Sequence, residues 1–355
     1  MTSRQHGVDV AKGIAIIMIV FGHVIRGLVA AHLASATGDA YRVADRTVYL
    51  VHLAVFALLA GLFVRAGVER AGRRRYLRSR LPTFIWLFLL WSLLQGALKV
   101  LASSEVNTPM TWGDVFRFWT PDGQMWFFPW IVLATLLVAL VEPWRGGARL
   151  TVLLGASAIV SLTLWGVGSV YAFIQGLPIT PFFVLGAWFG AERFGRLSSR
   201  RAPAIATAAG GLVVWLVVSW FTNATVPTGE GFSRTAGTVS TGIVGCVAGT
   251  AGVLALASML PRVGTGWLAL CGRHSLEIFL AQIVAAAAVR VVLLRLGVTD
   301  VPVHALLGTL VGVAVPLALA SVAENLGIGW LFRLPTPLQR RLASAAARLD
   351  GRLAR

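Results

Sequence analysis

The chain has 355 residues, of which 57% are apolar and only 13% charged, and its mean hydropathy is +0.78. A soluble globular protein carries about twice that charged fraction, so the composition excludes a soluble domain. The net charge of +17 would indicate nucleic-acid binding in a soluble chain. In a membrane protein, however, basic residues gather in cytoplasmic loops and face anionic lipids, so no nucleic-acid partner is predicted.

Apolar residues occur in blocks of about 20, the length of helix that crosses ~30 Å of hydrocarbon. This pattern predicts an all-α polytopic membrane protein with about ten transmembrane helices. The first block precedes Ala34-Ser35-Ala36, which resembles a cleavage site, but it is too long and too charged for a signal peptide. The number of helices depends on a tight turn predicted at Gly166-Val167-Gly168, so counts of nine and eleven remain alternatives. The predicted helices are 8–30, 47–65, 81–101, 125–142, 149–166, 170–190, 203–221, 237–259, 272–294 and 303–323.

Only two connections are long, 102–124 and 222–236, and no soluble domain or internal repeat fits the chain. Residues 1–331 are therefore predicted to form one transmembrane domain. Residues 332–355 form a basic tail, for which an interfacial helix and a disordered segment are both open. With the N-terminus inside, 23 of the 31 Lys and Arg residues fall on the cytoplasmic side. This bias predicts cytoplasmic termini in a multi-pass protein of the plasma (inner) membrane.

The first predicted helix carries four ionisable residues, Asp9, Lys12, His23 and Arg26. Such groups are costly in hydrocarbon, so their presence suggests function. At ~1.5 Å per residue His23 lies roughly 22 Å from the cytoplasmic entry, while His52 lies roughly 7 Å from the outer surface on the antiparallel second helix. The two imidazoles are thus expected at similar depth, lining one cavity.

An outward-facing polar pocket with His23 at its floor is the predicted active site. Arg26 follows His23 by three residues and shares its helix face, and Trp126 begins the fourth helix near the same boundary. Structural interpretations stay open for each residue. For His23 the alternative is a histidine that is hydrogen-bonded to a neighbouring helix, and for His52 and Trp126 the favoured interpretation is an interfacial anchor.

At the cytoplasmic end a run of arginines follows the second helix. Topogenesis accounts for many of them, but guanidinium groups also match phosphate oxygens, so a phosphate clamp is the alternative. Asp9 and Lys12 are predicted to form an ion pair, although Lys12 also qualifies for the clamp. Cys246 and Cys271 lack metal-ligand spacing, and neither a disulfide nor a metal site is predicted. The predicted clamp consists of Lys12, Arg73, Arg74, Arg75, Arg78 and Arg80.

Several stretches together resemble the acyltransferase-3 family of membrane acyl-CoA-dependent O-acyltransferases, in style nearest its fucose-4-O-acetylase-like branch. Lys12 and His23 are separated by ten residues, as in the opening signature of that family. Departures occur at Ala60, His274 and Gln282, where the family often has Ser, Asn and His. The other stretches follow in the family's order: YLVHLAVFALLAGLF (49–63), RRYLRSRLP (74–82), MWFF (125–128), PFFVLG (181–186) and GRHSLEIFLAQ (272–282).

The resemblance implies transfer of an acyl group, most often acetyl, from cytoplasmic acyl-CoA to a hydroxyl of a sugar, glycan or lipid-linked saccharide. His23 would act as general base, a role that suits a neutral imidazole. Arg26, His52 and Gln282 are the candidates for the oxyanion donor. Direct transfer and an acyl-histidine intermediate both stay open.

A secondary transporter or flippase for an anionic or lipid-linked substrate is the alternative function, because intramembrane His, Lys and Asp also form proton relays. Transporters commonly contain inverted repeats with matching broken helices. Here Pro178 and Pro181 interrupt the sixth predicted helix, and Pro316 in the tenth forms no convincing counterpart. The acyl group, the acceptor and the oligomeric state are not specified by the sequence.

Overall fold

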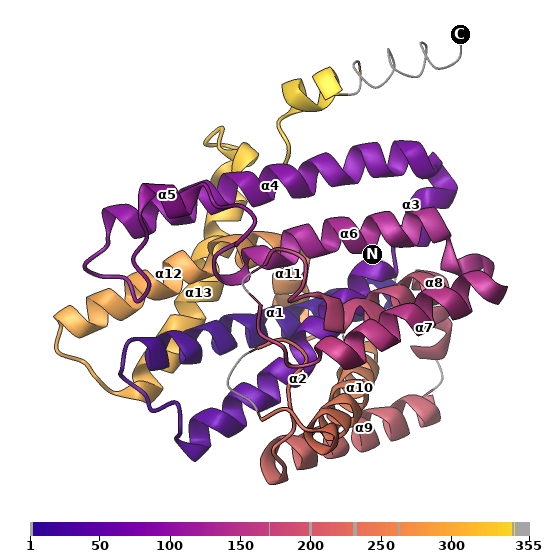
Figure 1. Cartoon of the computed structure of the whole chain (residues 1–355), viewed down its shortest axis with the longest axis horizontal. Helices are drawn as coiled ribbons and strands as arrows, with labels where there is room; N and C mark the ends of the chain where they lie inside the picture. Colours follow the sequence, from indigo (N-terminus) through magenta and orange to yellow (C-terminus); the bar gives the residue numbers. More distant parts are fainter. Residues whose placement is uncertain are drawn as a thin grey trace.

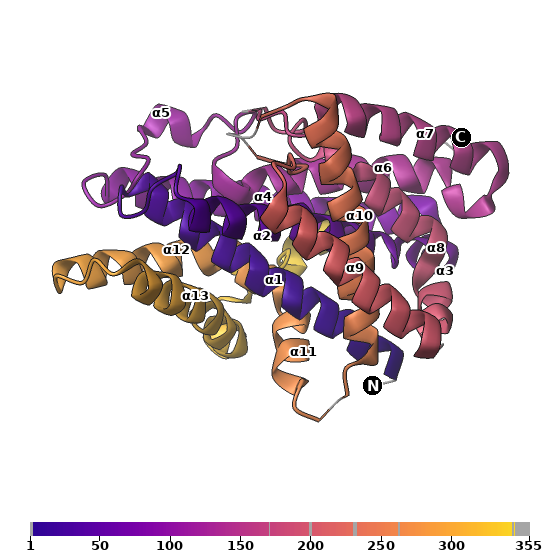
Figure 2. The same cartoon turned by 90° about the horizontal axis from the view of Figure 1, so that it is seen from below.

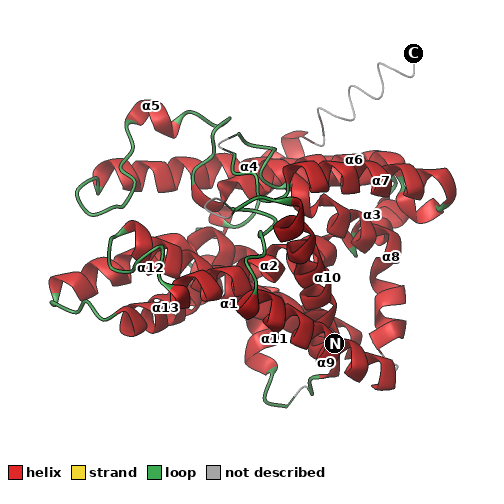
Figure 3. Ribbon diagram, turned by 60° about the horizontal axis from the view of Figure 1, so that its bottom comes forward, coloured by secondary structure: helices red, strands yellow, loops and turns green. Residues whose placement is uncertain are grey.

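The chain folds into a bundle of helices joined by loops, and its described part contains no strand (Figure 3). The structure is a computed structural model that describes residues 3–169, 171–198, 201–229, 233–261, 263–342 and 344. The α-helices are α1 (Ser3–Ala30), α2 (Asp39–Gly61), α3 (Val64–Ala71), α4 (Arg73–Leu101), α5 (Trp112–Val115), α6 (Phe127–Val141), α7 (Gly147–Leu164), α8 (Thr180–Ser198), α9 (Arg201–Phe221), α10 (Ala236–Met259), α11 (Gly266–Arg273), α12 (Ser275–Arg295) and α13 (Val301–Ala323). Four short 3-10 helices are η1 (Gly123–Trp126), η2 (Pro143–Arg145), η3 (Leu177–Ile179) and η4 (Gly329–Leu331).

Nine helical stretches in the described part are long and apolar enough to cross a membrane. The chain is therefore an all-α polytopic membrane protein, as predicted. The sixth predicted helix differs most: α8 begins at Thr180, and the described residues before it, 165–169 and 171–179, form an irregular connection closed by η3. The connection is longer than the predicted tight turn because Gly166 has a φ of +71° and Pro178 interrupts the chain just before α8.

Helix α1 lies at the centre and contacts α2, α10, α11, α12 and α13 (Figure 2). Small residues let α11 approach it closely. A Cβ atom on Gly272 would lie 1.8 Å from the carbonyl oxygen of Asp9, and one on Gly13 would lie 2.0 Å from the carbonyl oxygen of Leu268. Backbone contact of this kind needs glycine at both positions. The central helix is thereby held on several sides.

The two ends of the bundle differ in chemistry. The α3–α4 and α6–α7 connections lie at the right-hand end of Figure 1, and the α1–α2 and α12–α13 connections lie at the left-hand end. The arginine-rich start of α4 is at the first end. His23 lies about 10 Å before the end of α1, at the second end.

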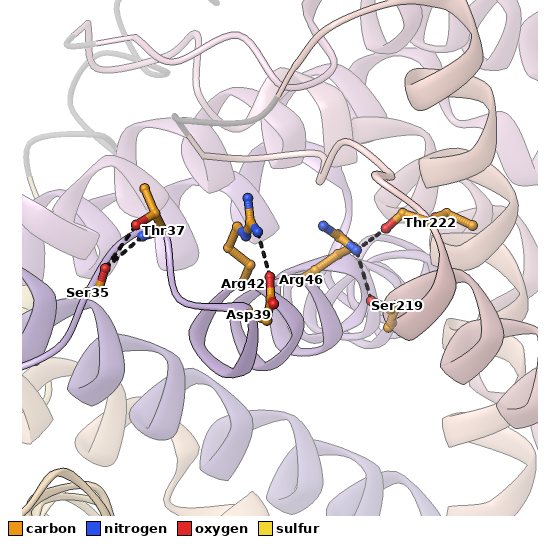
Figure 4. A network of polar contacts seen from close by, with 7 residues as sticks. All are labelled: Ser35, Thr37, Asp39, Arg42, Arg46, Ser219 and Thr222. Atoms are coloured by element: carbon orange, nitrogen blue, oxygen red, sulfur yellow. Dashed lines mark hydrogen bonds and ion pairs between the residues drawn. The ribbon is translucent and has the colours of Figure 1, made fainter.

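Helix α2 starts eight residues before its predicted first residue, 47, and is anchored by Arg46. The Arg46 guanidinium donates to the carbonyl oxygen of Ser219 over 3.0 Å and to that of Thr222, at the end of α9 (Figure 4). This contact orients the face of α2 that carries the candidate site residues.

The C-terminal segment passes over α4. The indole nitrogen of Trp91 donates to the carbonyl oxygen of Leu331 over 2.7 Å. Residues 336–342 are helical, whereas residues 343 and 345–355 of the predicted tail lie outside the described residues, so the choice between an interfacial helix and a disordered segment stays a prediction.

Candidate active site

His23 on α1 contacts Gln282 on α12. The Gln282 Nε2 lies 2.5 Å from the His23 Nδ1, and the Gln282 side chain is completely buried. An amide group can meet this nitrogen in two ways. If the amide Nε2 donates to Nδ1, the imidazole proton is on the Nε2 of His23. With the amide turned over, its oxygen accepts a proton from Nδ1 and leaves the Nε2 lone pair free.

Arg26, three residues after His23, is held by a carboxylate on α2. Its Nε lies 2.6 Å from Asp45 Oδ1 and its terminal nitrogen 3.0 Å from Asp45 Oδ2, so the pair is bidentate. The guanidinium carbon also lies 3.3 Å from the ring centroid of Tyr49. Asp45, Tyr49 and His52 share a face of α2 because they follow at intervals of four and three residues.

His52 is buried beside the same group. Its Nδ1 lies 2.6 Å from the Val48 carbonyl oxygen, and its ring meets that of Tyr49 edge-on with centroids 4.6 Å apart. Because a carbonyl oxygen only accepts, Nδ1 carries the proton and Nε2 retains its lone pair. In this tautomer the neutral His52 offers an acceptor and no further donor.

These residues surround a cavity of about 220 Å³, which we call the first cavity. The structure brings four of the predicted residues together in its wall: His23, Arg26, His52 and Trp126. Gln124 and Thr228 join them, and sequence reasoning did not identify either. The Gln124 Oε1 and the Thr228 Oγ1 are buried and have no hydrogen-bond partner in the described part of the chain.

His23 also lines a second cavity of about 200 Å³ between α1, α4, α12 and α13. Besides His23, its polar lining residues are Lys99, Asn107, Thr108, Arg290 and His304. Sequence reasoning missed these residues as a group, because each stands alone in an apolar or loop segment and only the tertiary fold joins them. His23 thus lies where two cavities meet.

A larger pocket of about 1240 Å³ occupies the opposite end of the bundle, and we call it the arginine pocket. Four predicted arginines line it: Arg73, Arg74, Arg75 and Arg78. Two further ones pair with Glu142: Arg145 from the α6–α7 connection and Arg149 from the first turn of α7. Gln339 and Leu342 of the C-terminal segment complete the wall.

Four predicted residues lie apart from these walls: Asp9, Lys12, Arg80 and Gln282. Neither Arg80 nor Lys12 is among the described residues that line the arginine pocket. The Lys12 Nζ lies 5.2 Å from the ring centroid of Phe63. The ion pair expected between Lys12 and Asp9 is not among those that the described residues form, because Lys12 turns toward this aromatic ring.

A family model described as an acyltransferase domain matches residues 5–321, nearly the whole chain. The match includes every candidate site residue of α1, α2, α4 and α12. No curated protein and no solved structure matches the chain.

Proposed function

The chain belongs to the acyltransferase-3 family and is a membrane acyltransferase; from this premise we propose that it moves an acyl group, most simply acetyl, from acyl-CoA to a hydroxyl group. The acceptor is a sugar, glycan or lipid-linked saccharide, and His23 is the general base. One observation carries the proposal. His23 projects from the central helix to the meeting point of two cavities that each carry polar side chains, with a buried amide on its Nδ1.

The arginine pocket supports acyl-CoA as the donor. CoA carries several phosphate groups, and guanidinium forks bind phosphate oxygens with charge-assisted hydrogen bonds. The charge distribution of the loops favours a cytoplasmic location for this end. On this proposal the pantetheine arm enters the bundle from the arginine pocket, and the acceptor reaches His23 from the opposite end.

The proposed reaction is a direct transfer. The His23 Nε2 takes the hydroxyl proton as the acceptor oxygen attacks the thioester carbonyl, with the Gln282 amide oxygen accepting from Nδ1–H. The tetrahedral intermediate then expels the CoA thiolate, which takes the proton from the imidazolium. The products are the O-acyl ester and free CoA.

Arg26 is the favoured donor to the oxyanion. Asp45 occupies two of its five N–H groups and the side chains of Tyr41 and Tyr49 also interact with the guanidinium, so only part of its donor capacity remains for the developing charge. His52 is less suited because its proton is bonded to the Val48 carbonyl oxygen. Gln282 is less suited because its amide is engaged with His23.

The test measures thiol release from acetyl-CoA by the purified protein in lipid nanodiscs, with and without a saccharide acceptor. We expect acceptor-dependent release that falls at least ~100-fold in His23→Gln, the scale of general-base catalysis. His274→Gln is the matched control, because His274 precedes α12 and lines neither cavity.

Full activity in His23→Gln contradicts the proposed role of His23. Movement of the acceptor across the membrane without acylation supports the transporter instead. An acyl group found on His23 after incubation without acceptor replaces direct transfer by the acyl-histidine route.

A further inference from the structure

The wall of the second cavity is mostly aliphatic, and cationic and polar side chains from four segments form its polar part. Lys99 comes from α4, Arg290 from α12 and His304 from α13, and Asn107 belongs to the loop after α4. In Figure 2 helices α12 and α13 lie side by side at the end of the bundle where α1 and α2 are joined. The cavity therefore lies at the end opposite the arginine pocket.

Lys99 is neutralised within the protein. Its Nζ lies 2.6 Å from Asp122 Oδ2 and donates to Thr108 Oγ1 over 2.7 Å. The nearby carboxylate of Glu105 is bound by Arg295 at 2.8 Å. The Nε2 of His304 donates to the Val298 carbonyl oxygen over 2.9 Å, so its ring is engaged with the backbone.

Arg290 has no such compensation. Its side chain is buried, with the residue 9% exposed, and among the described residues its guanidinium donates only to the carbonyl oxygens of Gly27 at 3.4 Å and Glu105 at 3.2 Å. No carboxylate of the described residues forms an ion pair with it. The cavity wall therefore carries a positive charge that no described carboxylate balances.

A buried charge without a counterion is costly, and an anion that entered the cavity would remove this cost. The attraction is stronger in a low-dielectric site than in water. A guanidinium group matches carboxylate and phosphate oxygens in particular. These three facts together define the chemistry of the ligand.

We infer that the second cavity binds an oxyanion, a carboxylate or a phosphate, that belongs to the acyl acceptor. Arg290 and Asn107 both bond to the Gly27 carbonyl oxygen, one helical turn or about 6 Å beyond His23. That separation matches an anionic group and a hydroxyl on the same or adjacent sugar rings. The acceptor is thus an acidic saccharide; this identity rests on the proposed function, whereas anion binding at Arg290 does not.

The experiment measures binding to the full-length protein in detergent by calorimetry, with glucuronate, glucose 1-phosphate and uncharged glucose as probes. We expect at least one charged probe to bind ~10-fold or more tightly than glucose, and Arg290→Gln to remove that preference. Arg295→Gln is the matched control, on the same helix but exposed and paired with Glu105. Preference for glucuronate identifies a carboxylate, and preference for glucose 1-phosphate a phosphate.

Asn107→Asp provides a variant that keeps the arginine. The new carboxylate would lie beside Arg290 and supply its counterion, so binding of the charged probe should again fall ~10-fold. Equal binding of glucose and both charged probes, or unchanged preference in Arg290→Gln and Asn107→Asp, overturns the inference.

Different results would contradict the oxyanion site and the proposed function. His23→Gln should still bind the charged probe, because the oxyanion contacts Arg290. Arg290-dependent binding without CoA release in any assay contradicts the function and leaves the oxyanion site standing. Acceptor-dependent CoA release that neither the acceptor's charge nor Arg290→Gln alters contradicts the oxyanion site and leaves the function standing.

Discussion

The two cavities that meet at His23 have similar volumes, but the arginines in their walls have different partners. In the first cavity, Arg26 is neutralised by the bidentate carboxylate of Asp45. In the second cavity, the described partners of Arg290 are two backbone carbonyl oxygens. A cation that is paired with a protein carboxylate can position the other groups of a site. A buried cation without a carboxylate partner is suited to binding an anionic ligand.

The unpaired polar atoms follow the same division. The first cavity presents the buried Gln124 Oε1 and Thr228 Oγ1 without partners among the described residues, groups that suit the hydroxyls of a sugar. The second cavity presents a guanidinium, which suits an anion. On the proposed function, one acceptor could use both surfaces, with its reacting hydroxyl at the His23 imidazole between them.

The largest expected effect comes from breaking the neutral pair of the first cavity. Asp45→Asn removes the carboxylate and leaves Arg26 as a partly buried, unbalanced cation, like Arg290. Since removal of one partner of a buried pair is strongly destabilising, we expect the free energy of unfolding to fall by about 3 kcal/mol. Chemical denaturation in detergent, followed by circular dichroism, measures this change.

The control for this prediction is Asp39→Asn, on the first turn of the same helix. Asp39 pairs with Arg42 over 2.5 Å, but both side chains are exposed (Figure 4). Exposed pairs contribute little, so the loss should stay below about 1 kcal/mol. Equal losses in the two variants would mean that Asp45 does not act as a buried counterion.

A second prediction extends the comparison to the arginine pocket at the opposite end. Arg74→Gln should raise the KM for acyl-CoA about 10-fold with little change in kcat, because it removes a phosphate contact that does not change during the reaction. The matched control is Arg80→Gln, an equally exposed arginine that lies outside the pocket wall. Steady-state kinetics at two salt concentrations measures both, and the effect should shrink at high salt. Equal KM changes in the two variants contradict a specific phosphate site.

Most of the fold was predictable because hydrocarbon-length apolar blocks leave few choices. The starts of α4, α7 and α10 differ from prediction by eight, two and one residues. Helix α2 begins at Asp39 rather than at residue 47. The start was predicted too late because the first turns of the helix carry four charged residues, Asp39, Arg42, Asp45 and Arg46. Hydropathy assigns such residues to a loop, whereas contacts with α1 and α9 satisfy two of them inside the bundle.

The site was predictable only where depth along a helix determines position. His23, Arg26, His52 and Trp126 were expected near the same level, and they line one cavity. The residues that surround these four were not predicted. Pairing Asp45 with Arg26, or placing Arg290 beside Gly27, requires knowledge of how each helix is rotated about its axis. Periodicity offered one signal: Asp45 precedes His52 by seven residues on the same face of α2.

The smallest effect tests the hydroxyl-binding side of the comparison. Thr228→Val replaces a buried hydroxyl that has no partner in the described structure, so the free energy of unfolding should change by less than about 1 kcal/mol. The KM for a saccharide acceptor should nevertheless rise several-fold, roughly 3- to 10-fold, because one hydrogen bond to the ligand is lost. Ser92→Ala is the control: Ser92 Oγ is likewise buried without a partner among the described residues, but it lines neither cavity. An acceptor KM that moves in Ser92→Ala and not in Thr228→Val would separate saccharide binding from the first cavity.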